Sequence, residues 1–297
     1  MNWAMIWQLF IQTLDASTPL LLAATGEIIG ESAGIANIGL EGIMLISAFM
    51  AVYADSAFAS PLLGVLAGLA TGLLLGVVHG YISAYMKGNQ IITGTGVNLF
   101  AAGFVAYSII AFFHVAGYYT IDLSLTVPKI YGVSPISISS LVIAVLAYYL
   151  LFKTQIGLAI RACGENPEAA DSVGVRVELV QTLTSSIAGL LTGLAGAFLS
   201  IDWNASITKQ ISAGRGFIAL ATVNFANWNP LLGIAGSFLF GFFWVLGEWI
   251  KSIGWLKQLI PVDLFNTIPY IATLVVVAGL IGRSRPPKYV GVPYKRE

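Results

Sequence analysis

Charge, cysteine and histidine are all scarce in this sequence. Asp, Glu, Lys and Arg together make up 9% of its 297 residues, whereas roughly a quarter is usual in a globular domain, so a soluble globular protein is excluded. Cys163 is the single cysteine, which excludes an internal disulfide and a cysteine-based metal site. His79 and His114 lie in apolar stretches and the formal net charge is zero. We therefore expect no metal centre and no nucleic-acid partner.

Apolar residues fill most of the chain. They make up 57% of it, and the mean hydropathy is +0.85. Because about 20 apolar residues cross a bilayer as a helix, the uncharged stretches predict an all-α membrane protein. We expect about nine transmembrane helices in a single domain over residues 1–297. The crossings are predicted at about 14–30, 36–53, 61–86, 91–115, 135–152, 179–201, 213–227, 231–250 and 265–283.

The positions of Lys and Arg predict how this bundle is oriented. Nine crossings place the two termini on opposite sides, and more of the basic residues fall on the side of the C-terminus, among them Lys87, Lys153 and Arg161. Loops rich in Lys and Arg stay in the cytoplasm. We therefore expect a multi-pass protein of the plasma or inner membrane, with its N-terminus outside and its C-terminus in the cytoplasm.

Two segments of the chain look alike. A glycine-led apolar stretch from Gly42 is followed by Pro-Leu-Leu-Gly at Pro61, and a similar stretch from Gly216 is followed by Pro-Leu-Leu-Gly at Pro230. In the predicted topology the first proline opens a helix outside and the second opens one inside. This indicates inverted internal repeats, which in transporters place the pathway at the repeat interface between interrupted helices. Chance is the alternative, because proline is common at a helix start.

A polar, glycine-containing break precedes each copy, at 30–42 and at 202–216. Irregular backbone at membrane depth is tolerated where it is buried in protein or lines a water-filled cavity. Glu41 and Arg215 lie in these breaks and become candidate pathway residues, since an intramembrane charge is costly. The alternatives are that Glu41 caps a helix start and that Arg215 reaches to an interface.

Further candidates for the substrate pathway are polar or aromatic residues near these breaks or in the adjoining helices. They are Asn37, Thr93, Thr95, Asn98, Ser212, Phe217 and Asn224. Several of these side chains could instead form hydrogen bonds to neighbouring helices.

Residues 153–178 hold seven of the 28 charges, so this segment alone has the charge density of a water-exposed loop. The sequence predicts two short helices in it. The first ends at Gly164, and the second has Asn166 as its N-cap, Pro167 in its first position and Glu168 in its first turn, and finishes near Gly174. Such a rigid cytoplasmic knob, on a bundle without a nucleotide-binding motif, suggests docking to a separate cytosolic partner. A solvated connector is the alternative.

Three motifs in combination resemble a known family. They are Asn-Ile-Gly-Leu-Glu-Gly at 37–42, the segment from Gly-Leu-Ala-Ile-Arg to Glu-Ala-Ala at 157–170, and Ala-Gly-Arg-Gly-Phe-Ile-Ala-Leu-Ala at 213–221, with Asn-Trp-Asn-Pro following. Together they resemble the permease subunits of ribose-type, nucleoside and simple-sugar ABC importers, most closely the shorter permease of the nucleoside systems. The resemblance covers nearly the whole chain.

This resemblance implies partners. They are a second, different permease, a cytosolic ABC ATPase that binds the ATP, an extracellular substrate-binding protein, and the surrounding membrane lipids, with no cofactor held by this chain. Carried onto this sequence, the resemblance places ATPase coupling on a set of residues in the 153–178 segment. They are Arg161, Gly164, Glu165, Asn166, Pro167, Glu168 and Ala170.

We therefore expect the membrane subunit of an ATP-driven importer, without catalytic residues. The few intramembrane charges favour an uncharged, hydroxyl-rich solute, and the resemblance alone favours a nucleoside over a simple sugar. An ion-coupled secondary transporter is the alternative, and it would need an ion site at the membrane midplane. An intramembrane enzyme is disfavoured, because Glu27 and Glu31 share a helix face without a recognisable nucleophile beside them.

Overall fold

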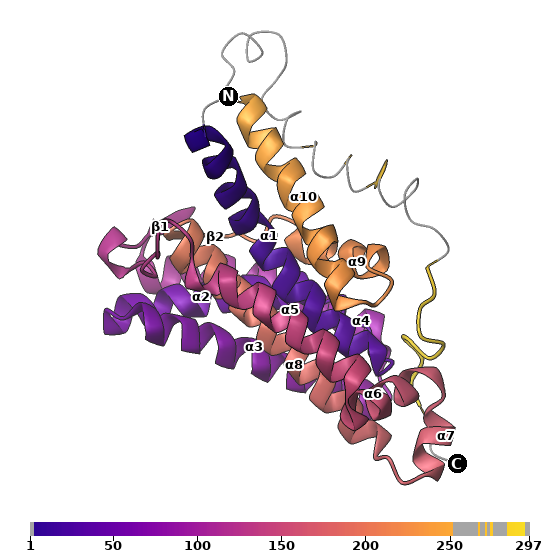
Figure 1. Ribbon diagram of the computed structural model, residues 1–297. Coiled ribbons are helices and arrows are strands. Elements are labelled where there is room, and N and C mark those ends of the chain that lie inside the picture. Colours follow the sequence, from indigo (N-terminus) through magenta and orange to yellow (C-terminus); the bar gives the residue numbers. More distant parts are fainter. Residues whose placement is uncertain (1–2, 252–266, 268–270, 272–273, 276–283, 295–297) are drawn as a thin grey trace.

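The structure is a computed structural model, and it describes residues 3–251, 267, 271, 274, 275 and 284–294. Helices make up most of this part of the chain (Figure 1). The α-helices are α1 (Trp3–Ser32), α2 (Leu40–Phe58), α3 (Pro61–Ala84), α4 (Gln90–Phe113), α5 (Pro135–Lys153), α6 (Gln155–Glu165), α7 (Pro167–Ser172), α8 (Val177–Ala197), α9 (Arg215–Phe225) and α10 (Pro230–Lys251). A 3-10 turn, η1 (Leu123–Leu125), and a π-helix, η2 (Phe198–Trp203), complete the helical elements.

The helices confirm an all-α membrane protein, but nine crossings are not confirmed. By length and composition, six of the described helices could cross a membrane: α2, α3, α4, α5, α8 with η2, and α10. The predicted crossing at 213–227 corresponds to α9, whose 11 residues span only about 16 Å at 1.5 Å per residue, well short of a hydrocarbon core of about 30 Å. The predicted crossing at 265–283 lies almost wholly outside the described residues.

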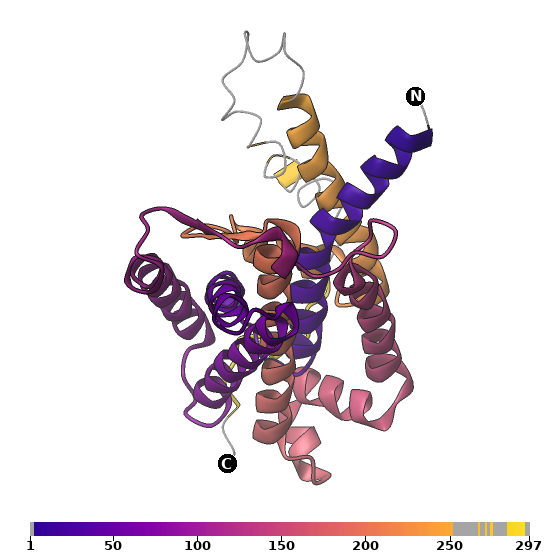
Figure 2. The ribbon, with the colours of Figure 1, turned by 90° about the vertical axis from the view of Figure 1, so that its left-hand side faces the viewer.

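The bundle has two distinct ends. Strands β1 (Tyr118–Thr120) and β2 (Ser206–Thr208) pair antiparallel at one end, which we call the sheet end. Helices α6 and α7 lie at the opposite end, which we call the α6–α7 end, and the two views agree on this separation (Figure 2). Helices α1 and α5 run from the sheet end to the α6–α7 end.

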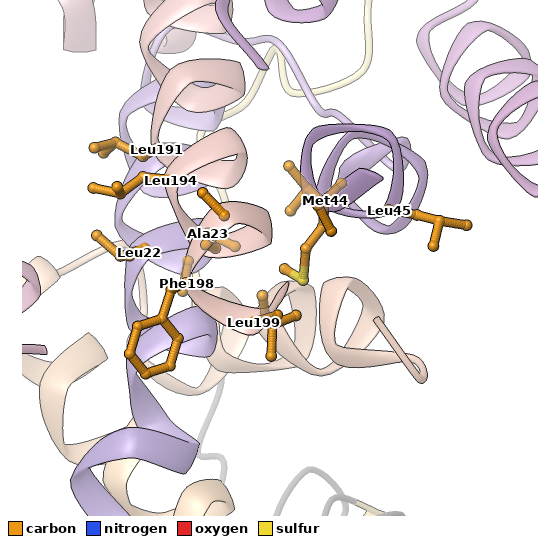
Figure 3. Packing of buried hydrophobic residues seen from close by; sticks show 14 of the residues in the cluster. Leu22, Ala23, Met44, Leu45, Leu191, Leu194, Phe198 and Leu199 are labelled. Carbon is orange, nitrogen blue, oxygen red and sulfur yellow. The ribbon is translucent and has the colours of Figure 1, made fainter. Parts of the chain in front are cut away.

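Helix α8 forms the centre of the bundle, and 89% of its membrane-length stretch is buried. Its core is apolar: residues of α1, α2, α8 and η2 pack together in one cluster (Figure 3). The labelled members of this cluster are Leu22, Ala23, Met44, Leu45, Leu191, Leu194, Phe198 and Leu199. By contrast, α3 and α4 expose large apolar side chains, such as Leu74 and Leu99, on the outside of the chain. These faces suit lipid or another membrane subunit.

The contact between α3 and α8 depends on glycines that face each other. A Cβ atom added at Gly72 would lie 2.3 Å from the carbonyl oxygen of Gly189, and one at Gly76 would lie 2.6 Å from that of Ser185. Small residues let helix backbones approach closely in lipid, where no hydrophobic force drives helices together.

The second helices of the two similar segments, α3 and α10, begin at opposite ends of the bundle, as inverted repeats require. Pro61 opens α3 near the sheet end, where Gly64 approaches Ile201 of η2. Pro230 opens α10 at the other end, two residues after Trp228, which shares a cavity with Arg161 of α6. The interruptions that precede the copies are also present, because a loop separates α1 from α2, and a longer segment containing β2 separates η2 from α9.

We expect Gly72→Ala to lower the free energy of unfolding by about 1–3 kcal/mol, the usual cost of overpacking a close contact. The reason is that the added methyl group would meet backbone atoms of α8, which cannot rotate away. Thermal unfolding of the purified chain in detergent would measure this. Gly103→Ala is the matched control, since a Cβ atom there has nothing within 4 Å, and equal melting temperatures for the two variants would contradict the prediction.

Candidate functional site

The loop between α1 and α2, residues 33–39, is mostly buried inside the bundle. Its backbone is held by side chains from other helices. Gln181 of α8 donates from Nε2 to the carbonyl oxygen of Ala33 (3.1 Å), and Gln90 of α4 accepts from the backbone N–H of Ala36 (2.6 Å). Backbone groups inside a membrane must find partners within the protein, so these amides allow the irregular loop to exist there.

Asn37, a predicted pathway residue, is part of this loop and is 1% exposed. Its backbone N–H donates to Oε1 of Glu27 (2.6 Å), and its side-chain oxygen accepts from the N–H of Gly39 (2.9 Å). Glu31, one turn after Glu27, accepts a hydrogen bond at Oε2 from Nε1 of Trp228 (2.6 Å). The two glutamates therefore tie α1 to the loop and to the α9–α10 connection. No nucleophile is paired with either of them among these contacts.

Asn98 of α4 joins the loop to the first turn of α2. Its Nδ2 donates to the carbonyl oxygen of Ile38 (2.9 Å), and its Oδ1 accepts from the N–H of Gly42 (2.7 Å). Gly42 permits this approach, because an added Cβ would lie 2.8 Å from the Cα of Asn98. The predicted pathway residue Asn98 thus binds the backbone on both sides of the helix start.

Glu41 lies in the first turn of α2 and caps a different helix. Its two carboxylate oxygens accept from the N–H groups of Gly214 (2.7 Å) and Gly216 (2.8 Å), which form the start of α9. A Cβ atom at Gly216 would lie 2.4 Å from the backbone nitrogen of Glu41. A carboxylate is stabilised at the positive N-terminal end of a helix, so Glu41 joins the starts of the two repeated segments.

Arg215 is 6% exposed, so its side chain lies inside the protein and does not extend outward as the alternative interpretation requires. Its guanidinium group lies 4.0 Å from the ring centroid of Trp244 on α10 and 5.0 Å from that of Trp203 in η2. It also donates to the carbonyl oxygens of Ile211 and Ser212 (3.1 and 3.3 Å). Aromatic faces attract a desolvated cation, and this accounts for a buried arginine beside the start of α9.

A cavity of about 270 Å³ opens where α2, α4 and the segment before α9 meet. It brings together three predicted pathway residues, Glu41, Asn98 and Ser212, and adds two that sequence reasoning missed, Lys209 and Gln210. The sequence offers no signal for these two, because polar residues are ordinary in a turn. The volume of the cavity is slightly below the usual range of small-molecule sites.

The remaining predicted pathway residues lie outside this cavity. The hydroxyl groups of Thr93 and Thr95 on α4 donate to backbone carbonyls of their own helix (2.9 and 2.8 Å). Phe217 and Asn224 are exposed on α9, seven residues apart and therefore on one face. In the single chain, α4 and α9 thus expose polar and aromatic side chains. A second subunit could cover them, or they could line a water-filled path.

The 153–178 segment forms the two short helices that the sequence predicts. Asn166 is the N-cap of α7, since its side-chain oxygen accepts from the N–H of Ala169 (3.1 Å), and Pro167 occupies the first position. Of the predicted coupling residues, Glu165, Asn166 and Glu168 are exposed. Gly164, Pro167 and Ala170 are buried, and the guanidinium of Arg161 lies 5.1 Å from the ring centroid of Phe152.

Helix α6 rests directly on the end of α1. A Cβ atom at Gly164 would lie 2.3 Å from the carbonyl oxygen of Ser32 and 3.2 Å from the backbone nitrogen of Gly34. This is a contact between backbones, without a flexible side chain in between. A displacement of α6 would therefore reach the α1–α2 loop, and through it Asn98, Glu41 and the cavity.

Comparison with known proteins identifies the family of this chain. Residues 9–277 match the family described as branched-chain amino acid transport system / permease component. The chain is 33% identical to the nucleoside ABC transporter permease protein NupC of Lactococcus lactis subsp. cremoris, over 94% of this chain and 93% of the relative. It is also 33% identical to the guanosine ABC transporter permease protein NupQ of Bacillus subtilis, over 95% and 94%.

A third relative is archaeal. The chain is 32% identical to the putative glucose ABC transporter permease protein TsgC13 of Haloferax volcanii, over 92% of this chain and 91% of the relative. All three likenesses extend over nearly the full length of both proteins. The chain therefore belongs to the branched-chain amino acid transport system permease family, and it is a multi-pass transport subunit of the plasma membrane rather than an enzyme.

Proposed function

We propose that this chain forms part of the translocation pathway of an ATP-driven importer for nucleosides. Full-length likeness to permeases that are named for nucleoside and guanosine transport supports the solute class. The observation that carries the mechanism is the backbone contact between Gly164 of α6 and Ser32 at the end of α1. It connects a charged, exposed knob to the buried loop beside the cavity.

Family membership implies an ATPase and a substrate-binding protein as partners. In the proposal, the α6–α7 end faces the cytoplasm and the ATPase, which binds the ATP, so this chain needs no cofactor of its own. The sheet end, and with it the N-terminus, faces outside, where the binding protein delivers the solute. A second, different permease covers the exposed faces of α4 and α9, so that Thr95, Phe217 and Asn224 line a path between the two subunits.

Coupling would follow the chain of contacts described above. ATP-driven closure of the ATPase moves α6 and α7, and Gly164 passes the movement to Ser32 and the α1–α2 loop without absorbing it in side-chain rotation. Glu41 then moves the start of α9 together with the start of α2. The cavity between these helix starts opens in turn to the two sides of the membrane.

The cavity suits an uncharged solute with hydroxyl and amide groups. Asn98, Gln210 and Ser212 offer hydrogen-bond donors and acceptors. The carboxylate of Glu41 already accepts two backbone hydrogen bonds. A few polar groups in a small cavity bind a solute weakly. Weak binding suits a pathway to which a separate substrate-binding protein delivers the solute.

Proteoliposomes with the intact complex should take up labelled guanosine when ATP is inside, and should not take up labelled ribose. Both solutes carry ribose hydroxyls, so the comparison isolates recognition of the base. Uptake of ribose without guanosine would overturn the nucleoside assignment. Uptake driven by an ion gradient without ATP would overturn the importer mechanism and support a secondary transporter instead.

We expect Asn166→Ala to leave the chain in the membrane but to uncouple ATP hydrolysis from import and weaken copurification of the ATPase. The substitution removes the N-cap of α7, which is typically worth about 1 kcal/mol. Asn166→Asp keeps a capping oxygen and should keep coupling. Exposed Ser172→Ala on the same helix is the control, and an unchanged transport rate in Asn166→Ala would refute the coupling role.

Charge reversal at the neighbouring position tests the docking surface separately from the cap. Glu165→Lys changes an exposed side chain at the end of α6, so the chain should fold and insert normally. Because the knob contacts the ATPase in this proposal, the variant should lose ATPase in copurification and lose ATP-driven uptake. Normal uptake with normal ATPase recovery would contradict the proposed surface.

Glu41→Gln should weaken both the fold and transport. One carboxylate oxygen becomes an NH₂ group that faces a backbone N–H, and a hydrogen bond to a charged group is typically worth about 1.5–3 kcal/mol. Thermal unfolding and ATP-driven uptake would measure the two effects. Glu248→Gln is the matched control, because Glu248 is exposed and pairs with Lys251 one turn along the same helix. A Glu41→Gln variant as active and as stable as the control would show that the junction between α2 and α9 is dispensable.

A further inference from the structure

The segment 284–294, which we call the C-terminal strap, lies across the α6–α7 end (Figure 1). It has no regular helix or strand. Its backbone bonds to two places that the coupling path uses: the N–H of Tyr289 donates to the carbonyl oxygen of Gly164 (2.9 Å), and the N–H of Gly291 donates to that of Gly34 (3.2 Å). The strap therefore spans the junction at which α6 meets the α1–α2 loop.

Tyr294 anchors the far part of the strap. It is 6% exposed and packs in one cluster with Cys163 of α6, Ala170 of α7 and Val177 of α8. Its hydroxyl group donates to Oδ2 of Asp171 on α7 (3.1 Å). The side chain of Tyr294 thus fills the small core that joins α6 and α7 to the start of α8.

Lys87 extends this anchor to the turn between α3 and α4. Its Nζ lies 5.6 Å from the ring centroid of Tyr294 and 3.2 Å from Oε1 of Glu178, at the start of α8. At the near part of the strap, the N–H of Arg285 donates to Oδ1 of Asn227 in the α9–α10 connection (2.9 Å). The strap consequently touches the α1–α2 loop and the α9–α10 connection as well as the knob.

From these contacts we propose that the C-terminal strap and the α6–α7 knob move as one body, and that Tyr294 is the positioning residue that joins them. Tyr294 acts through other residues and touches neither solute nor ATP. Its ring keeps α6 and α7 in a fixed relative orientation. A displacement of the knob therefore moves Gly34 and Asn227 through the strap, and the short helices do not bend relative to each other. This inference rests on the proposed ATPase coupling.

The test compares the intact complex carrying Tyr294→Ala, Tyr294→Phe or Val292→Ala in proteoliposomes. The measured quantity is solute imported per ATP hydrolysed. Tyr294→Ala should lower this ratio about tenfold in complexes that still contain the ATPase, whereas Tyr294→Phe keeps the ring and should retain most of it. Val292 is an exposed strap residue, so its variant should match the wild type.

Cys163 provides a native reporter of the same contact. Burial raises the pKa of its thiol to about 11, and the side chain is fully covered, so maleimide should label it slowly in the wild-type complex. Loss of the Tyr294 ring should speed this labelling clearly, and Tyr294→Phe should not.

A second measurement covers the case in which Tyr294→Ala fails to assemble. Spin labels on Ser172→Cys and Val292→Cys, both at exposed positions, report the distance between knob and strap with and without trapped ATP. An unchanged distance supports the proposal, and a distance that changes on ATP binding overturns it.

The outcomes separate this inference from the proposed function. A wild-type complex that imports no solute on ATP hydrolysis contradicts the proposed function itself. A wild-type complex that imports normally, together with a Tyr294→Ala complex that has the same solute-to-ATP ratio, overturns only the role of the strap.

Discussion

The need to satisfy the polar groups of buried backbone governs the centre of this protein. The α1–α2 loop leaves the helical hydrogen-bond pattern, and its buried N–H and C=O groups need other partners within the protein. Gln90, Asn98 and Gln181 supply them from α4 and α8, and Glu27 supplies one from α1. The loop is therefore the point at which separate helices are bound to one another, and a movement of the loop is shared by all of them.

Close backbone contacts give this centre its stiffness. Where Gly164 meets Ser32, and where Gly216 meets Glu41, an added Cβ would lie within 2.5 Å of a backbone atom. Such contacts have no side-chain rotamers to change, so a displacement on one side is passed on to the other. Glycines also allow α3 to pack closely against α8. Glycine thus brings backbones together both within the bundle and at the two junctions that the proposed coupling uses.

Local signals explain what the sequence could predict. Pro61, Asn166 and Pro167 set helix starts by their own chemistry, and α3 and α7 begin where these residues indicate. The sequence predicts a crossing at 213–227, whereas α9 has only 11 residues and its start is held by Glu41, far away in the sequence. The burial of Arg215 depends on Trp203 and Trp244, and the strap has no periodic pattern. Such features follow from tertiary contacts, which a single sequence does not display.

The half-buried Glu41 and the buried Arg215 at the repeat junction are neutralised in different ways, and this bears on the solute. Glu41 is balanced by N–H groups at the start of α9, where the helix dipole supplies roughly half a positive charge. Arg215 lies against aromatic faces and backbone carbonyls. Each charge is thus compensated by groups that belong to the fold. A charged solute would have to compete with those groups for either residue, whereas a neutral solute can use the remaining amide and hydroxyl groups. Neither Glu41 nor Arg215 therefore favours a charged solute.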